Sequence, residues 1–404
     1  MNKIKKAVVI GAGKSGKGAA SLLESQGYEV ILTDKKEGFI HDDPSLPLEG
    51  VSLLILSPGV LPSHPLAAKA LRMGILVMGE VELGLLSLRN QRMVAVTGSN
   101  GKTTTVLLIT HVLNKAGLRA CALGNVGVSL CSYAAKANPD EILVIELSSF
   151  QLQMLPIAPY FEVAAILNIT PNHLDRHSSM QEYAECKLKL QMCTKEGGVC
   201  FVSKQVRDNF SFLKEVQIFK MAKEERQDPK LGLPEACNIQ SAREIAMHFG
   251  IEEEMFSQAL LQFRKPPHRI EWVAEIDQVA YYNDSKASNV EAVIHAVSLF
   301  TGLIVLIAGG VDKGAPYKPW IDAFGKKVKA IVAFGMAKEK MVSELQEAFP
   351  IQCANCLQEA AQKARRFASA GDTILFSPGC SSYDQFASYE ERGETFRKII
   401  QEGV

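Results

Sequence analysis

The chain has 404 residues, of which 44 are basic and 44 are acidic, so its formal net charge is zero. A balanced charge without a long run of one sign gives no electrostatic support for binding to nucleic acid or to an anionic membrane, and we expect neither as a partner. The length exceeds that of one ordinary core and predicts two or three domains, of which we expect three. Composition therefore favours small-molecule chemistry.

Nine cysteines, odd in number and mostly within apolar runs, favour reduced thiols in a cytosolic protein over a disulfide framework. Cys353 and Cys356 have the spacing of half a zinc site or a redox pair. No second pair follows at zinc spacing, so we interpret both as ordinary cysteines at a strand-to-helix junction. The first apolar run, Ala7–Ile10, is too short for a signal peptide, and no segment approaches the roughly 18 apolar residues of a membrane helix. We expect a cytoplasmic protein.

Short β-branched runs alternate with helical stretches along the chain. Because these runs lack polar alternation, they are typical of strands that are buried on both faces in parallel sheets covered by helices. The predicted fold class is therefore α/β. The expected strands are Ala7–Ile10, Val30–Leu32, Leu53–Leu56, Met93–Val96, Ile142–Ile145, Val163–Leu167, Val199–Val202, Ile304–Ala308, Ala330–Phe334 and Ile374–Phe376.

Two breaks in the pattern suggest domain boundaries. One is the polar segment 87–92, and the other is 264–268, where paired prolines prevent the preceding helix from continuing. The predicted domains are 1–90, 91–264 and 265–404.

The first glycine cluster, GAGKSG, follows the first predicted strand and opens a helix. Gly11, Gly13 and Gly16 let backbone N–H groups approach a pyrophosphate at the N-terminus of that helix. Asp34, at the end of the next strand, can bind a ribose or a base edge. This pattern indicates a dinucleotide such as NAD, or else a tight turn that needs small residues, and the cluster alone leaves the nucleotide open.

The second glycine cluster, VAVTGSNGKTTTV, also joins a predicted strand to a helix. It is shorter than the common phosphate loop G-x-x-x-x-G-K-[ST], because its first glycine, Gly98, has moved two residues along the chain. Gly98 and Gly101 free the backbone to wrap around phosphate, and Lys102 can reach the β- and γ-oxygens. Thr103 or Thr104 can offer a hydroxyl to Mg²⁺, so ATP is the expected ligand.

Two further predicted strands end in groups that suit a divalent cation. Glu146 follows the run 142–145, beside the phosphate loop, where an acid that holds Mg²⁺ is expected. His173 follows the next strand, and an ordinary surface histidine is an equal alternative there.

Three predicted strands of the third domain end in polar, mostly glycine-rich segments, which are NDSKASN, GGVDKG and SPGCSSYD. The carboxyl ends of the strands form the binding edge of an open α/β sheet. We therefore expect these segments to share a binding site, with three ordinary loops as the alternative.

The chain resembles the Mur ligase family through a series of motifs that occur in family order over essentially its whole length. They are TGSNGKTT, ELSSFQL, NITPNHLDRH followed by Lys187, PPHRIE, NDSKASN, GGVDKG and SPGCSSYDQF. The last four are together most similar to the branch that adds D-glutamate to UDP-N-acetylmuramoyl-L-alanine. The shortened phosphate loop is this family's own version.

The resemblance implies three domains and one reaction. An N-terminal Rossmann-like domain would hold the UDP of the substrate, a central P-loop ATPase-type domain with a parallel sheet would bind ATP, and a C-terminal Rossmann-like domain would bind D-glutamate. The carboxylate of the alanyl group would take the γ-phosphoryl group, and the amine of D-glutamate would attack the acyl phosphate. The implied cofactors are ATP, two Mg²⁺ and a carbamylated lysine at Lys187, and the expected state is a monomer.

The resemblance also implies a role for individual residues. The catalytic residues would be Lys102, Glu146, His173 and Lys187, and the metal ligands Thr103, Glu146, His173 and carbamylated Lys187. ATP would contact Gly98, Ser99, Asn100, Gly101, Lys102, Thr103, Thr104, Asn238, Arg269 and Asp284. The UDP substrate would contact Gly11, Gly13, Lys14, Ser15, Gly16, Asp34, Lys35, Ser57, Pro58, Gly59, Asn125 and Gln151. D-glutamate would contact Lys286, Ser288, Lys313, Ser382 and Tyr389.

Some positions depart from the family pattern. Cys237 precedes Asn238 where the family has a histidine, and the segment before this pair is shorter than usual. Tyr389 stands where phenylalanine is expected, and Lys35 with Lys36 replaces a pair that includes arginine.

Three alternatives stay open. A sibling ligase would add alanine, diaminopimelate or a dipeptide, or glutamate to folate, although the third domain lacks the Asn-Pro-Arg element of the diaminopimelate-adding sibling. A nicotinamide oxidoreductase built on the first glycine cluster would leave Glu146, Lys187 and the second glycine cluster without a role. A non-catalytic nucleotide switch would hydrolyse or bind ATP regardless of D-glutamate.

Overall fold

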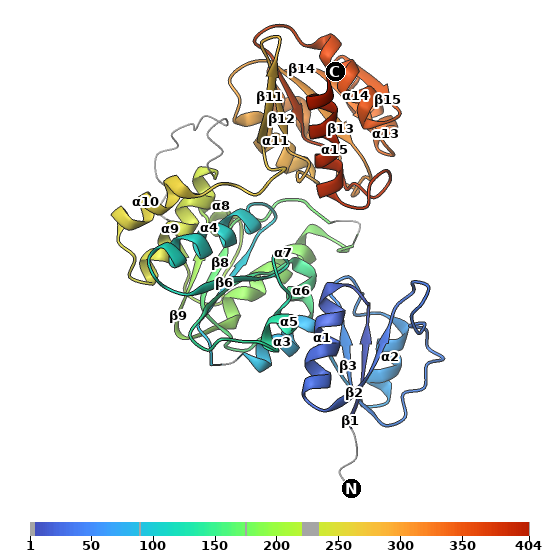
Figure 1. The fold of residues 1–404 in the computed structure, drawn as a ribbon, viewed down its shortest axis with the longest axis vertical. Helices are drawn as coiled ribbons and strands as arrows, with labels where there is room; N and C mark the ends of the chain where they lie inside the picture. The colour runs from blue at the N-terminus through green and yellow to red at the C-terminus, as the bar shows by residue number, and fades with distance from the viewer. Residues whose placement is uncertain (1–4, 89, 174–175, 220–233, 404) are drawn as a thin grey trace. The chain divides into compact units, whose positions relative to one another are not determined.

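The computed structural model describes residues 5–88, 90–173, 176–219 and 234–403 (Figure 1). Helices and strands alternate along these residues, and the strands form one four-stranded and two six-stranded sheets. The predicted α/β class is confirmed.

The N-terminal sheet has the strand order β2-β1-β3-β4 and is parallel. Ala7 and Val9 of β1 pack with one core that includes α1, while Val8 and Ile10 pack with a second core that includes α2. Because helices cover both faces of the sheet, side chains on both faces of β1 are apolar, and residues 7–10 form an unbroken apolar run. The elements are β1 (Lys5–Ile10), α1 (Lys14–Ser25), β2 (Tyr28–Thr33), β3 (Val51–Leu56), α2 (Pro65–Arg72), β4 (Leu76–Gly79) and α3 (Glu80–Ser87).

The central sheet is also parallel, with the order β10-β9-β8-β5-β7-β6. Because β5 lies between β8 and β7, the loop that follows β5 is flanked by the carboxyl ends of both neighbours. The strands are β5 (Met93–Thr97), β6 (Ala120–Gly124), β7 (Ile142–Glu146), β8 (Phe161–Ile166), β9 (Thr194–Val202) and β10 (Gln217–Ile218). The helices are α4 (Lys102–Lys115), α5 (Leu130–Ala134), α6 (Ser149–Met154), α7 (Met180–Leu188), η1 (Lys189–Cys193), α8 (Lys204–Asn209), α9 (Ala236–His248) and α10 (Glu253–Gln262).

The helices α1 and α3 of the N-terminal part pack on α5 of the central part. At Gly84, an added Cβ would lie 2.5 Å from the Leu130 Cβ, so this contact requires glycine. Beside it, the buried carboxylate of Glu80 accepts a hydrogen bond from the Cys131 backbone N–H at 2.9 Å. Burial raises the pKa of Glu80. These parts belong to one compact unit, and the C-terminal sheet belongs to a second that also contains residues 170–173 and 176–183.

The C-terminal sheet has the order β11-β12-β16-β13-β14-β15. Its strands are β11 (Glu271–Ile276), β12 (Val279–Asn283), β13 (Ile304–Gly309), β14 (Val328–Phe334), β15 (Ile351–Ala354) and β16 (Thr373–Phe376). Its helices are α11 (Val290–Ser298), α12 (Pro319–Phe324), α13 (Lys338–Leu345), α14 (Leu357–Phe367) and α15 (Tyr389–Glu402). The predicted domain limits fall between α3 and β5 and between α10 and β11, and they stay predictions.

Every strand that the sequence predicts is present, and the C-terminal sheet is parallel except for one edge strand. The edge strand β11 runs antiparallel to β12. Asp277 and Gln278, which join the two strands, have φ values of 49° and 58°, as a tight hairpin turn with the right-handed twist requires. Strands β4, β6, β10, β11 and β15 were not predicted, and β12 was expected only as a strand of unstated bounds before the segment NDSKASN. In β11 no side chain is fully buried, so it lacks the apolar run that marked the predicted strands.

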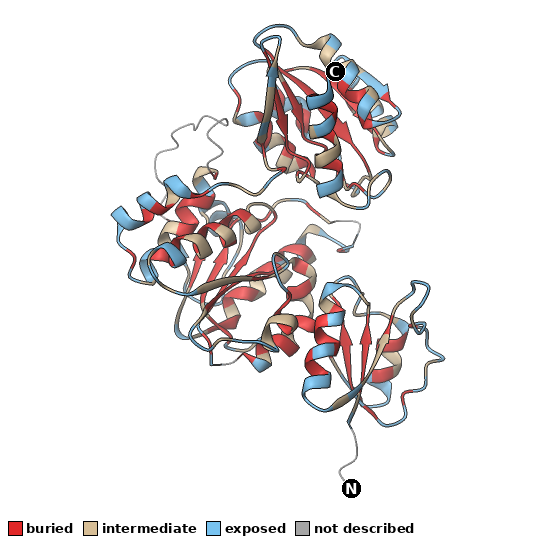
Figure 2. Ribbon diagram, in the orientation of Figure 1, coloured by how far each residue is buried: buried red, intermediate tan, exposed pale blue. Residues whose placement is uncertain are grey.

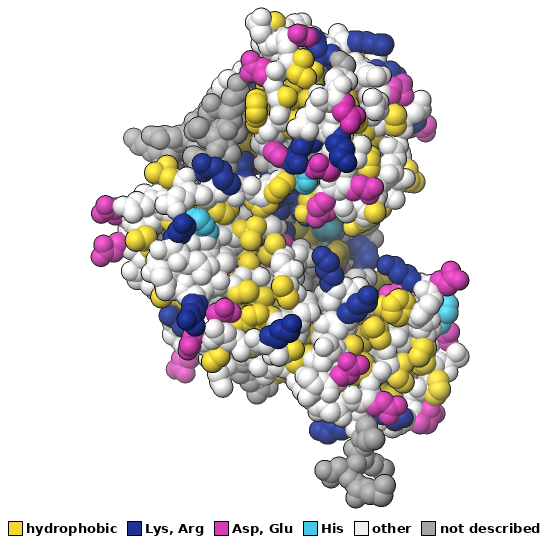
Figure 3. Space-filling view, viewed as in Figure 1, with side chains coloured by type: hydrophobic (Ala, Val, Ile, Leu, Met, Phe, Trp, Pro, Cys, Tyr) yellow, Lys and Arg dark blue, Asp and Glu magenta, His cyan; other side chains and the backbone are white. Residues whose placement is uncertain are grey.

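Strands are mostly buried and outer helix faces mostly exposed (Figure 2). On the face drawn in Figure 3, basic and acidic side chains are interspersed. No helix within the described ranges is long and apolar enough to cross a membrane. All nine cysteines are free thiols, and the exposed Cys353 and Cys356 lie at the junction of β15 and α14, as predicted.

Candidate active site

The phosphate loop, residues 98–101, joins β5 to α4. Gly101 precedes α4 with φ 83°, in the left-handed region, and a Cβ there would lie 2.3 Å from Asn238 Oδ1. Glycine is therefore required at this position for both backbone conformation and space. The buried Asn238 also lies 3.3 Å from the hydroxyl of Thr105, on the first turn of α4. The structure thus brings Asn238 to the phosphate loop, although the segment that precedes it, 220–233, lies outside the described residues.

Lys102 folds back over the phosphate loop. Its Nζ donates hydrogen bonds to the carbonyls of Gly98 at 2.7 Å and Ser99 at 2.9 Å. The ammonium therefore lies at the N-terminus of α4, where helix N–H groups and the helix dipole also favour anions. This arrangement can neutralise phosphate oxygens.

Glu146, at the end of β7, is brought together with two other predicted site residues. Its buried carboxylate accepts a hydrogen bond from Thr103 Oγ1 at 2.8 Å through one oxygen and from Asn125 Nδ2 at 2.8 Å through the other. A carboxylate beside a hydroxyl is an oxygen donor set of the kind Mg²⁺ prefers, so these residues fit a magnesium site. Asn125, predicted to contact the muramoyl side, here orients the carboxylate, which the sequence did not predict.

Lys187, near the end of α7, is buried at the same loop. The residue is only 1% exposed, and its Nζ donates to the Gly98 carbonyl at 2.9 Å and lies 3.5 Å from Thr97 Oγ1. Lys102 and Lys187 thus share one carbonyl. Burial, and then the charge of Lys102, lower the pKa of Lys187 well below its ordinary value. The amine is therefore biased toward its neutral form.

His173 belongs to the second compact unit, whereas Glu146 and Lys187 belong to the first. Its backbone has φ 55°, which is uncommon for a residue other than glycine, and its carbonyl accepts from Arg176 N and His177 N. Its role as a metal ligand stays a prediction. Within the described residues, no group of three or more His, Cys, Asp and Glu side chains could hold a metal.

The first glycine turn, residues 11–16, is held by neighbouring strands. A Cβ on Gly16 would lie 1.7 Å from the Gly11 carbonyl oxygen, so only glycine fits there, whereas a Cβ on Gly13 would meet nothing within 4 Å. Asp34 accepts a hydrogen bond from Ala12 N at 2.7 Å, which lowers its pKa, and Ser57 Oγ donates to the Gly11 carbonyl at 2.9 Å. The turn is thus closed around Gly16 and open at Gly13.

Other residues that were predicted to contact the UDP substrate are described by their exposure or by bonds outside the first glycine turn. Lys14 and Lys35 are exposed near the first glycine turn, as is Gly59 after β3. Gln151 is buried, and its carboxamide oxygen accepts a hydrogen bond from Ser148 N at 2.8 Å as part of a capping box that begins α6. The role of Gln151 at a muramoyl group stays a prediction.

The residues predicted to bind D-glutamate form two pairs at the carboxyl edge of the C-terminal sheet. Lys286 Nζ lies 3.6 Å from the centre of the Tyr389 ring, and Lys313 Nζ donates to Ser288 Oγ at 3.0 Å. Tyrosine therefore offers Lys286 the aromatic face that the expected phenylalanine would provide. The predicted Ser382 is buried in the loop after β16.

Asp284 lies at the end of β12 and is buried. It accepts hydrogen bonds from Ser377 Oγ at 2.7 Å and Ile270 N at 3.2 Å, and burial raises its pKa to about 7. Arg269 precedes this strand pair and is half-buried. The contacts of both residues with ATP stay predictions.

Sequence reasoning missed Arg392 of α15, which is fully buried. Its guanidinium donates to the Ser285 carbonyl at 2.7 Å, the Ser285 hydroxyl at 3.0 Å and the Cys380 carbonyl at 3.1 Å. These bonds tie the loop after β12 to the loop after β16. No local signal distinguishes Arg392 from the charged residues around it, because its partners are far away in the sequence.

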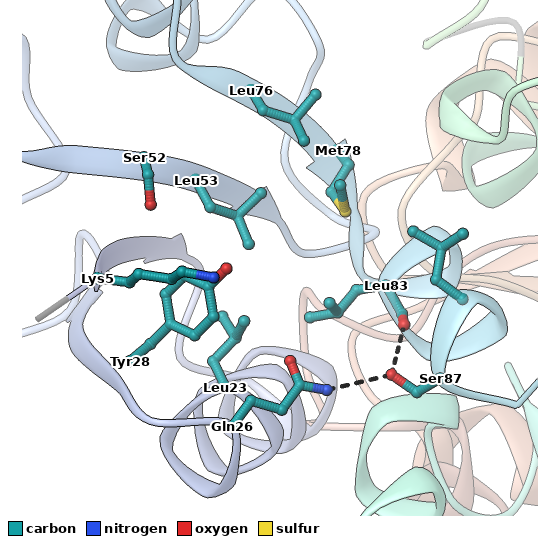
Figure 4. Close-up of a pocket in the computed structure, with 11 residues that line it drawn as sticks. Lys5, Leu23, Gln26, Tyr28, Ser52, Leu53, Leu76, Met78, Leu83 and Ser87 are labelled. Atoms are coloured by element: carbon teal, nitrogen blue, oxygen red, sulfur yellow. Dashed lines mark hydrogen bonds between the residues drawn. The ribbon is translucent and has the colours of Figure 1, made fainter. Parts of the chain in front are cut away.

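A cavity of about 490 Å³ lies elsewhere, at the amino ends of the N-terminal strands (Figure 4). This is the edge of the sheet opposite the first glycine turn. Its lining is mostly aliphatic, with Lys5 as the only charged side chain, and it includes none of the predicted site residues. The lining residues are Lys5, Leu23, Gln26, Tyr28, Ser52, Leu53, Leu76, Met78, Leu83, Leu86 and Ser87. We therefore do not assign the reaction to this cavity.

Comparisons with known proteins match the central and C-terminal parts of the chain and also its whole length. Residues 96–232 match the Mur ligase middle domain, and residues 268–380 match the Mur ligase glutamate ligase domain. The UDP-N-acetylmuramoylalanine--D-glutamate ligases of Protochlamydia amoebophila and Chlamydia caviae are 36% and 37% identical to this chain, and each alignment covers 98% of both proteins. The crystal structure of UDP-N-acetylmuramate-alanine ligase MurC from Thermotoga maritima is similar in fold, with a TM-score of 0.61 at 15% identity over 99% of this chain and all of that one.

Proposed function

Because the chain belongs to the Mur ligase family, we propose that it joins D-glutamate to UDP-N-acetylmuramoylalanine in an ATP-dependent reaction of peptidoglycan precursor synthesis. The observation that carries this proposal is the similarity to ligases of that name over 98% of both chains. The arrangement of Lys102, Thr103 and Glu146 around the phosphate loop supports it, because it suits phosphoryl transfer.

In the proposed reaction, an oxygen of the alanyl carboxylate attacks the γ-phosphorus of ATP, and the bond to the β-phosphate oxygen breaks to give an acyl phosphate and ADP. The amine of D-glutamate then attacks the acyl carbon, an amine proton is lost, and inorganic phosphate leaves. Lys102 would neutralise charge on the oxygens of the transferred phosphoryl group, and its position over the phosphate loop supports this role. Mg²⁺, held by Thr103 and Glu146, would supply further neutralisation of phosphate charge.

Lys187 is proposed to carry a carbamate. A plain ammonium so close to Lys102 would be repelled by it and disfavoured by burial, and both effects bias the amine toward the neutral form that reacts with CO₂. The carbamate would be a carboxylate-like oxygen ligand suited to Mg²⁺, with His173 as a further proposed ligand. The burial of Lys187 beside the Gly98 carbonyl supports this assignment.

The first glycine turn is proposed to hold the UDP pyrophosphate rather than NAD. The space beyond Gly13 and the exposed start of α1 support this, because backbone N–H groups there can meet a pyrophosphate. Calorimetry should detect binding of the UDP substrate without ATP. Tight NADH binding by the whole protein would contradict the assignment and would favour the oxidoreductase alternative.

The amino acid is proposed to be held by Lys286, Ser382 and their neighbours in the C-terminal sheet. Donors that pair with the side-chain carboxylate of D-glutamate would be left unpaired by D-alanine, so D-alanine should be a very poor acceptor. We further propose domains of 1–90, 91–264 and 265–404 and a monomer that acts in the cytoplasm. Light scattering during gel filtration tests the monomer.

The decisive experiment measures ADP formation in the presence of the UDP-muramoyl-alanine substrate and a panel of amino acids. D-glutamate alone should stimulate ADP formation strongly. Stimulation by L-alanine, diaminopimelate or a dipeptide would identify a sibling activity instead, and ADP formation that ignores the amino acid would identify a nucleotide switch.

A further inference from the structure

Asn168, two residues beyond the end of β8, pairs with the backbone of the phosphate loop in both directions. Its Oδ1 accepts a hydrogen bond from Asn100 N at 2.8 Å, and its Nδ2 donates to the Asn100 carbonyl at 3.1 Å. Its own backbone carbonyl also accepts a hydrogen bond from Ser99 N at 2.9 Å. Three hydrogen bonds thus fasten the two residues between Gly98 and Gly101 to one asparagine.

Such a partner matters because the loop contains two glycines. Glycine at both ends of the pair Ser99 and Asn100 gives the backbone many accessible conformations, of which only one suits a bound phosphate. The side chain of Asn168 forms both of its bonds in the conformation that Asn100 takes here, and these bonds favour that conformation over others. It therefore selects one loop conformation before any nucleotide binds.

The residue after Asn168, Ile169, is held by a similar pair of hydrogen bonds. Gln205 of α8 accepts a hydrogen bond from Ile169 N at 3.2 Å and donates to the Ile169 carbonyl at 3.0 Å. The amide of Gln205 thus holds the segment that follows β8, and the amide of Asn168, in that segment, holds the phosphate loop. These bonds connect α8 to the loop through the residues that follow β8.

The bonds also decide which loop N–H groups face phosphate. Those of Ser99 and Asn100 already donate to Asn168, which leaves phosphate oxygens to the N–H groups that begin α4 and to Lys102. We propose that Asn168 is a positioning residue that presets the phosphate loop for ATP, with Gln205 supporting it. This inference rests on the proposed ligase function, since it concerns the same ATP site.

The test compares Asn168→Ala with Asn114→Ala, a matched control at the other end of α4. Asn114 makes the same two-way amide pair, with Ala120, at 3.1 and 3.0 Å, but far along the helix from the loop. Asn168→Ala should raise the KM and Kd for ATP by roughly tenfold to a hundredfold, as expected for two lost hydrogen bonds. The KM for the UDP substrate should change by less than about twofold. Asn114→Ala should leave both KM values near those of the unmodified protein.

A merely structural role for Asn168 would give a different result. It would lower Tm and the fraction of active protein, and hence the apparent kcat, without changing the KM for ATP. That outcome, or an Asn168→Ala protein with ordinary ATP affinity, would overturn the inference. An unmodified protein that lacks D-glutamate-dependent ADP formation would instead overturn the proposed function, so the two failures are distinguishable.

Two further variants keep the test decisive if Asn168→Ala does not fold. Asn168→Asp keeps the acceptor for Asn100 N and loses the donor, so its ATP affinity should be reduced while its Tm stays close to that of the unmodified protein. Gln205→Ala should weaken ATP binding by a smaller factor, of roughly twofold to fivefold, because it acts through Ile169. Unchanged ATP affinity in both variants would contradict the proposal.

Discussion

The two glycine-rich turns of this chain each follow a parallel strand and open a helix, yet they are equipped differently. The first turn is fastened by Asp34 and Ser57, whose side chains bond its backbone, and it is open at Gly13. The second turn has a cation, Lys102, over its own carbonyls and a carboxylate, Glu146, beside its first helical turn. The difference agrees with the roles that we propose, in which the first turn binds a phosphate group and the second transfers one.

The two acids express this difference most directly. Asp34 bonds to backbone N–H groups, which hold its oxygens in place and lower its pKa. Glu146 instead accepts from the side chains of Thr103 and Asn125, which can reorient when an ion approaches. The partners of Glu146 thus suit a carboxylate that binds an ion, whereas those of Asp34 also hold the turn in shape.

The largest expected effect comes from Lys102→Ala. Loss of a cation that stabilises transferred phosphoryl oxygens should cost on the order of 3 kcal/mol in the barrier, roughly a hundredfold in kcat. Binding of the UDP substrate, measured by calorimetry, should stay nearly intact because that site is on another sheet. Lys14→Ala is the control, since Lys14 begins α1 as Lys102 begins α4, and it should affect the KM for the UDP substrate with little change in kcat. A Lys102→Ala protein with near-ordinary kcat would contradict the proposal that the second turn, unlike the first, takes part in phosphoryl transfer.

Lys187→Ala should lose most activity, by roughly tenfold or more, because the metal would lack the carbamate ligand that we propose at this lysine. Short carboxylic acids that diffuse into the vacated space should restore part of the activity. The same acids should not restore Lys102→Ala, whose missing group is a cation. Incorporation of labelled CO₂, followed by carbon NMR, checks the modification directly. An unmodified amine in a nucleotide complex prepared with bicarbonate would count against it.

A smaller effect is expected from Gly16→Ala in the first turn. The added Cβ would be forced toward the Gly11 carbonyl, which should destabilise the fold by about 1–3 kcal/mol. Thermal unfolding measures this change. Gly13→Ala is the matched control, because its Cβ meets only open space, and it should leave Tm unchanged while weakening the binding of the UDP substrate by roughly tenfold through contact with pyrophosphate. Equal Tm losses in both variants would show that the first turn is not open at Gly13.

Sequence patterns sufficed for strands that are buried on both faces, such as β1 and β13, because a short unbroken apolar run between turn residues favours a buried strand. They did not suffice for β11, whose half-exposed edge position leaves no such run. The placement of candidate residues at strand ends, such as Glu146 in β7 and Asp284 after β12, was predictable from the sequence. The bonds of Asn168 and Arg392 were not, because each depends on partners that only the folded chain brings near.

The packing of α3 on α5 limits how the molecule can be divided. A cut between α3 and β5 follows the sequence boundary, but it would remove Leu130 from its place against Gly84 and Cys131 from its bond to Glu80. The separated piece would expose an apolar helix face together with a carboxylate that is buried in the whole chain. Fragments intended to carry the proposed UDP site alone should therefore be redesigned along that face if they are to remain free of aggregation.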